Sequence, residues 1–128
     1  MTRAGHRRVV PIVSGQVSGL LEAEILPGGA DWQLVRPDGT VDIDTRYSAR
    51  TAAGEYVHLR TAGVRSGPPP VLAALLRGEP VDPDDYYFRL AVHLETAAPR
   101  LAGLERSLFI ASAVRGADSV AYTAYRVT

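Results

Sequence analysis

The sequence contains no cysteine and no lysine among its 128 residues, and each absence removes a class of chemistry. Without cysteine there is neither a disulfide nor a thiolate nucleophile. Without lysine the chain cannot form a Schiff base with a carbonyl substrate, and all 14 basic residues are arginine. Any chemistry must therefore use carboxylates, histidine, tyrosine, serine, threonine or arginine.

Long apolar runs and an excess of one charge are also missing. No apolar stretch approaches the roughly 20 residues of a membrane-spanning helix, and the N-terminal residues do not resemble an export signal. The 14 acidic residues balance the arginines, so the net charge is zero and the pI is near 6.8. Nucleic-acid binders concentrate positive charge. We therefore expect a cytoplasmic protein that binds neither nucleic acid nor membrane.

The length and the turn spacing predict a single β-barrel domain over residues 1–128. Short segments rich in β-branched and aromatic residues recur about every 10 residues between glycine, proline and aspartate turns. One short helix is expected near residues 70–77, between a run of prolines and Gly78. The fold class is therefore mainly β, an antiparallel barrel of about eight strands, a size that can enclose one small ligand.

The expected strands alternate apolar and ionic side chains with a period of two. The pattern is clearest from Thr40 to Thr51 and recurs in residues 55–60 and 86–95. Each strand thus has one apolar face and one ionic face, but the alternation leaves open which of them is interior.

The ionic faces supply the candidate catalytic residues. His58 titrates near neutral pH and could move a proton, while the neighbouring guanidinium of Arg60 could stabilise an enolate. The same side chains could instead form cross-strand ion pairs on a solvated outer face. The candidate catalytic residues are His58, Arg60, Tyr87, Arg89 and Glu95.

A second group of residues is predicted to bind the substrate. Asp31 and Trp32 follow a glycine turn, where they could place a carboxylate and an indole against a ligand. They could equally be a turn cap and a core aromatic residue. The candidate substrate-binding residues are Asp31, Trp32, Asp44, Arg46, Tyr56 and Arg65.

Metal, nucleotide and hydrolase motifs are weak or missing. His93 and Glu95, together with His58, imitate a two-histidine, one-carboxylate metal site, but surface residues explain the pattern as well. There is no phosphate-binding glycine loop and no Gly-x-Ser-x-Gly elbow. We expect no metal and no cofactor.

The segments Pro-Gly-Gly-x-Asp-Trp at residues 27–32 and Tyr-Tyr-Phe-Arg at residues 86–89, in their order and spacing with several shorter ones, resemble the DUF3237 family over nearly the whole chain. The resemblance implies a calycin-like β-barrel, and it implies that some relatives perform cofactor-free dehydration and Michael-type ring closure in bacterial natural-product biosynthesis. The most specific segments are Pro-Gly-Gly-x-Asp-Trp and Tyr-Tyr-Phe-Arg. The full set is Val10-Pro11-Ile12, residues 26–33, Arg46-Tyr47, Gly63-Val64-Arg65, residues 86–89, Glu95-Thr96 and residues 106–109.

Two departures from the family pattern alter these expectations. Family sequences usually begin with an additional strand, so this barrel is expected to be open on one edge or completed by a partner, for example in a homodimer. In addition, Gly103-Leu104-Glu105 replaces a Trp-Leu-Asn segment, which would enlarge a pocket and add the carboxylate of Glu105.

Together these features lead to three hypotheses. The first is a cofactor-free acid/base enzyme that dehydrates or cyclises a polyketide-like carbonyl substrate. The second is a non-catalytic carrier that uses the same barrel to bind a small molecule. The third is an interaction module that pairs through an open barrel edge.

Overall fold

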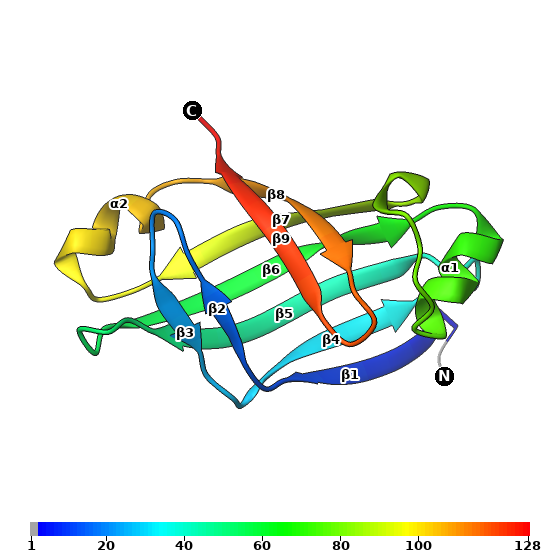
Figure 1. The fold of residues 1–128 in the computed structure, drawn as a ribbon, viewed down its shortest axis with the longest axis horizontal. Helices are drawn as coiled ribbons and strands as arrows, with labels where there is room; N and C mark the ends of the chain where they lie inside the picture. The colour runs from blue at the N-terminus through cyan, green and yellow to red at the C-terminus, as the bar shows by residue number, and fades with distance from the viewer. Residues whose placement is uncertain (1–2) are drawn as a thin grey trace.

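An antiparallel sheet of nine strands makes up most of the structure, a computed structural model that describes residues 3–128 (Figure 1). The prediction of a mainly β, antiparallel fold is confirmed, with nine strands rather than about eight. The extra strand arises because residues 15–25 form two three-residue strands around a loop. The strands are β1 (His6–Ile12), β2 (Gly15–Val17), β3 (Ala23–Ile25), β4 (Gly29–Val35), β5 (Val41–Arg50), β6 (Tyr56–Ser66), β7 (Tyr87–Glu95), β8 (Phe109–Arg115) and β9 (Val120–Arg126).

The turns and helices follow local sequence signals. Gly39, with a φ of 90°, closes the predicted hairpin between β4 and β5, and its N–H donates to the carbonyl of Arg36 at 2.9 Å. The predicted helix is α1 (Pro69–Leu76). A second helix, α2 (Ala102–Glu105), directly follows the 3₁₀ turn η2 (Pro99–Leu101), and a further 3₁₀ turn, η1 (Pro83–Asp85), precedes β7. No helix within residues 3–128 is long and apolar enough to span a bilayer.

The strand order leaves the sheet open between its first and last strands. The order is β1-β4-β5-β6-β7-β8-β9, with β3 pairing to both β2 and β5. Among residues 3–128 no backbone pairing joins β9 to β1. In Figure 1, β9 runs diagonally across the other strands, and the hydroxyl of its Tyr122 hydrogen-bonds that of Tyr47 on β5. Side chains therefore connect β9 to the opposite part of the sheet.

The apolar faces of the strands form the interior. Val41, Ile43 and Ala49 of β5 are buried, and the residues paired with them on β6 continue the same face. The barrel interior is thus the apolar register of each strand, which settles the question that the alternation left open.

Candidate functional site

The ionic faces of β5, β6 and β7 point away from the interior. Arg46, Arg60 and His93 lie side by side across these strands, and all three are exposed. Trp32, with 42% of its surface exposed, is also on the outer face, opposite to its neighbour Asp31. The predicted residues on the outer face are Trp32, Asp44, Arg46, Tyr56, His58, Arg60, Tyr87, Arg89 and Glu95. Only Asp31 and Arg65 of the predicted set face inward.

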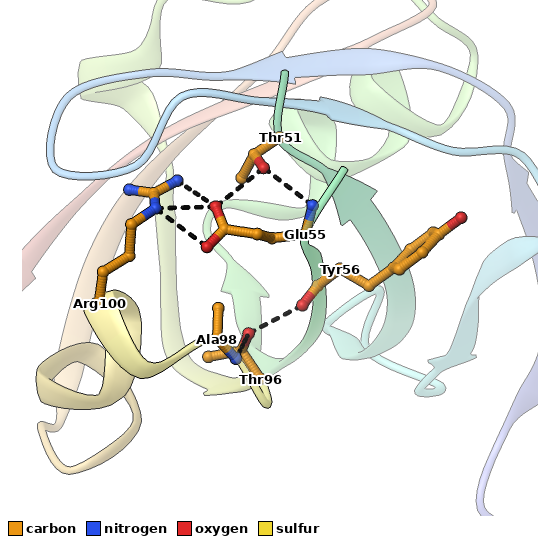
Figure 2. Close-up of polar contacts among 6 residues, drawn as sticks. All are labelled: Thr51, Glu55, Tyr56, Thr96, Ala98 and Arg100. Carbon is orange, nitrogen blue, oxygen red and sulfur yellow. Dashed lines mark hydrogen bonds and ion pairs between the residues drawn. The ribbon is translucent and has the colours of Figure 1, made fainter. Parts of the chain in front are cut away.

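A hollow of about 600 Å³ lies on the outer surface, near the start of β6 and the end of β7. Figure 2 shows the contacts that fix its rim: Arg100 Nε donates to Glu55 Oε1 at 2.8 Å, and Thr51 Oγ1 donates to the same oxygen at 3.0 Å. The hydrogen bond from Arg100 lowers the pKa of Glu55. The hydroxyl of Thr96 donates to the Tyr56 carbonyl at 2.8 Å. The lining residues are Ser48, residues 54–58, residues 95–98 and Glu105.

Ser48, His58 and Glu95 form a row across three strands in this hollow. Ser48 Oγ lies 3.4 Å from His58 Nδ1, and Glu95 is the strand partner of His58. A nucleophile and its base need a shorter contact, about 2.6–3.2 Å, and the base needs a hydrogen bond to the acid. No hydrogen bond between His58 and Glu95 is formed among the described side chains. The row therefore has the residue types of a hydrolase triad without its contacts.

Polar side chains also interrupt the apolar interior, and they form what we call the interior polar cluster: Asp31, Gln33, Thr45, Thr61 and Arg65. Asp31, Thr45 and Thr61 lie in one row across β4, β5 and β6. The two threonine hydroxyls are hydrogen-bonded at 2.5 Å. Because an unpaired polar group is costly inside a protein, such a cluster needs either internal partners or a ligand.

Asp31 stands where the pairing of β4 with β5 is interrupted. The paired positions skip Trp32 and Gln33, and Asp31 Oδ1 accepts the free N–H of Asp44 at 3.1 Å. Its Oδ2 accepts the side-chain amide of Gln33 at 2.7 Å. Burial nevertheless raises the pKa of Asp31, and these two hydrogen bonds and the charge of Arg65 only partly offset it.

Arg65 is the most unusual residue of the cluster. Its side chain is 3% exposed, its guanidinium lies 5.7 Å from the centre of the Phe88 ring, and its Nε has no hydrogen-bond partner among residues 3–128. Burial lowers the pKa of Arg65 to about 10, with further lowering by the charges of Arg115 and Arg8. No carboxylate among the described residues lies within ion-pair distance.

Two neutral phenols complete the interior. The hydroxyls of Tyr47 and Tyr122 are hydrogen-bonded to each other. Burial is the main cause that raises the pKa of Tyr47, and the neighbouring Tyr122 raises it further. Burial likewise raises the pKa of Tyr122. Both groups therefore hold their protons at neutral pH and can donate hydrogen bonds.

The inner face of β9 is covered only in part. The register with β8 puts Val120, Ala124 and Arg126 on the same side as the buried Ala111 and Ala113. These three β9 residues are nevertheless exposed, including Val120 at 51%, whereas Tyr122 on the same face reaches Tyr47 in the interior. Part of the inward-facing side of β9 is therefore open to solvent.

Gln33, Tyr47 and Tyr122 were not predicted as site residues from the sequence. A signal was present for Gln33, because it interrupts the register of the buried residues on β4. The tyrosines gave no such signal, since a phenol fits an apolar register. Within residues 3–128, no group of three His, Asp or Glu side chains is placed to hold a metal ion.

Comparison with known proteins identifies the family. Residues 1–127 match the family described as "Protein of unknown function (DUF3237)". The chain belongs to the DUF3237 family. It is 40% identical to UPF0311 protein blr7842 of Bradyrhizobium diazoefficiens, over 98% of this chain and 83% of that one.

Solved structures of DUF3237 relatives have the same fold. The conserved protein of unknown function RPA1785 from Rhodopseudomonas palustris is 39% identical, with a TM-score of 0.92 over 95% of this chain and 83% of that one. A β-barrel-like protein from Acinetobacter baumannii is 38% identical, with a TM-score of 0.84 over 99% and 82% of the two chains. These relatives support the barrel-like fold of DUF3237.

Proposed function

We propose that this DUF3237 chain binds a small carbonyl compound inside its barrel and catalyses proton transfer on it without a cofactor. The observation that carries the proposal is that the Asp31 carboxyl, whose pKa is raised by burial, faces the same interior as the buried guanidinium of Arg65 and interacts with its charge. Residues with perturbed pKa values and a specific charged neighbour are the usual components of acid/base sites.

The proposed reaction divides the roles among the inward-facing groups. The Asp31 carboxylate takes the proton α to the carbonyl, and Arg65 stabilises the enolate oxygen that forms. Loss of a β-hydroxyl then requires a proton, which a phenol of the Tyr47 and Tyr122 pair supplies, so that water leaves. The proton on Asp31 returns through solvent to the phenolate, which restores both groups. Addition of a hydroxyl to the resulting alkene would close a ring, the reaction that the family resemblance implies.

This assignment differs from the sequence hypothesis in its residues. The acid/base role expected of His58 passes to Asp31, and the role of Arg60 passes to Arg65, because only the second pair faces the interior. Catalytic roles for the outer residues stay predictions. Of the predicted catalytic set, only His58 and Glu95 line the outer hollow.

The test is deuterium exchange into a neutral ketone, 4-phenyl-2-butanone, followed by NMR in D₂O. Wild-type protein should accelerate exchange at the carbons next to the carbonyl, and Asp31→Asn should reduce the acceleration at least 100-fold, the lower range for a general base. Asp84→Asn, in the exposed turn η1, is the control and should behave as wild type. Exchange that survives Asp31→Asn would contradict the proposal. Binding without any exchange would favour the carrier function instead.

A further inference from the structure

Two buried polar atoms of the interior polar cluster have no hydrogen-bond partner. Among residues 3–128, the buried side-chain atoms in this state are Arg65 Nε and Gln33 Oε1. Native proteins satisfy most such groups, and leaving one unpaired costs about 1–3 kcal/mol. One atom is a donor on a cation and the other is an acceptor, so the group that completes them must offer an acceptor and a donor.

The charges around Arg65 make the missing acceptor anionic. The groups that act on its guanidinium are Arg8 from β1, Asp31 from β4, Tyr86 next to β7 and Arg115 from β8. Together with Arg65 itself these are five groups, of which three are cationic and one is a carboxyl. The surroundings of Arg65 therefore carry an excess of positive charge. A second carboxylate would balance it, whereas a neutral ligand would not.

Three of the neighbouring groups, Arg115, Tyr86 and Asp31, already have hydrogen-bond partners. Arg115 donates through its guanidinium to the carbonyl of Ala117 at 3.0 Å, and its backbone N–H donates to the hydroxyl of Tyr86 at 2.9 Å. Asp31 accepts from both Gln33 and Asp44. The guanidinium of Arg65 and the side-chain carbonyl of Gln33 therefore remain for a ligand, and both lie on the interior side of the sheet.

We infer that the ligand of the barrel is a small hydroxy acid, whose carboxylate pairs with Arg65 and whose hydroxyl donates to Gln33 Oε1. This inference rests on the proposed function, because it names the substrate class of the same interior site. The hydroxyl and the acid group are the features that a dehydration substrate of this site would present to the protein.

The test uses mandelate, its neutral amide mandelamide, and phenylacetate, which lacks the hydroxyl. Binding is followed by NMR on the Nε–H signal of Arg65. Mandelate should shift this signal and bind at least 10-fold more tightly than either mandelamide or phenylacetate. Arg65→Met should abolish mandelate binding, while Arg50→Met should not change it. Arg50 is a matched control because it is an exposed arginine of β5 outside the candidate site residues.

Several outcomes would overturn the inference. These are equal affinity for mandelate and mandelamide, equal affinity for inorganic phosphate, binding that persists in a folded Arg65→Met variant, or no binding of mandelate at millimolar concentration. The proposed function fails separately, because its exchange test uses a neutral ketone. If the protein exchanges the ketone but binds mandelamide more tightly than mandelate, the proposed proton transfer is supported and the hydroxy-acid ligand is contradicted.

Discussion

Replacing Arg65 with methionine should make the ligand-free protein more stable. The pKa of Arg65 falls from its ordinary value to about 10, chiefly because the charged side chain is buried. At about 1.4 kcal/mol per pKa unit, this corresponds to roughly 3 kcal/mol against the charged form. Methionine retains most of the apolar stem but loses the contact with Phe88, worth about 1 kcal/mol. The expected net gain is therefore about 2 kcal/mol.

The pH range of this effect follows from the direction of the shift. The pKa of Arg65 is lower in the folded protein than in the unfolded chain, so the unfolded chain binds more protons between about pH 10 and pH 12.5. The penalty is fully present below pH 10 and disappears only above it. Measurements at pH 7 should therefore show the full gain.

Thermal and urea unfolding provide the assay. For a chain of 128 residues, a gain of about 2 kcal/mol should raise Tm by about 7 °C. Arg89→Met is the control and should change stability by less than about 0.5 kcal/mol, because Arg89 is exposed. A loss of stability in Arg65→Met would refute the reasoning, since it would mean that the guanidinium is well paired in the folded protein.

Three further predictions concern the interior and its walls. Tyr122→Phe should cost about 1–2 kcal/mol by leaving the Tyr47 hydroxyl unpaired, and adding Tyr47→Phe should restore most of the loss in a urea-unfolding double-mutant cycle. Gly63→Ala should lower the free energy of unfolding by roughly 3 kcal/mol or more, because the new Cβ would lie 2.0 Å from a backbone oxygen of β7. Gly103→Ala is the control: no atom lies closer than 3.9 Å to its new Cβ, so Tm should stay unchanged or rise. Because burial raises the pKa of Asp31, its ionisation destabilises the folded protein at any pH above that raised pKa. This penalty disappears as the pH falls toward 3.8, the ordinary pKa of the carboxyl. The stability advantage of Asp31→Asn over wild type should therefore shrink as the pH falls. An advantage that grows toward low pH would show that the carboxylate is stabilised, not penalised, by its surroundings.

Local signals predicted much of the fold. The alternation from Thr40 to Thr51 gave β5, and the run of prolines before residue 71 gave α1. The division of residues 15–25 into β2 and β3 was not predictable, because three-residue strands are held by their partners and not by their own pattern. Glu24 and Ile25 pair with Arg50 and Ala49 of β5, contacts about 25 residues away in the sequence.

The site was predicted only in part. Asp31 was identified by the glycine turn before it and Arg65 by a segment that resembles the family, but the alternation could not assign them to the interior. The ionic faces drew attention because they hold most of the titratable groups, yet those faces are solvated. The informative positions were the polar residues within the apolar register, such as Thr61 between Leu59 and Gly63.

The energetic difference between the two faces explains why the interior positions carry more information about function. On the outer face, Arg46 and Arg60 are direct strand neighbours, but water screens their repulsion and no ligand is needed to tolerate them. Inside the barrel, the same guanidinium group has no water, and Arg65 reduces stability by an amount comparable to the contribution of a large buried side chain. An anionic ligand that pairs with Arg65 would recover part of this free energy on binding. The stability gain and the loss of anion binding in Arg65→Met should therefore occur together. A variant that shows only one of them would contradict the link between the cost of burying Arg65 and ligand binding.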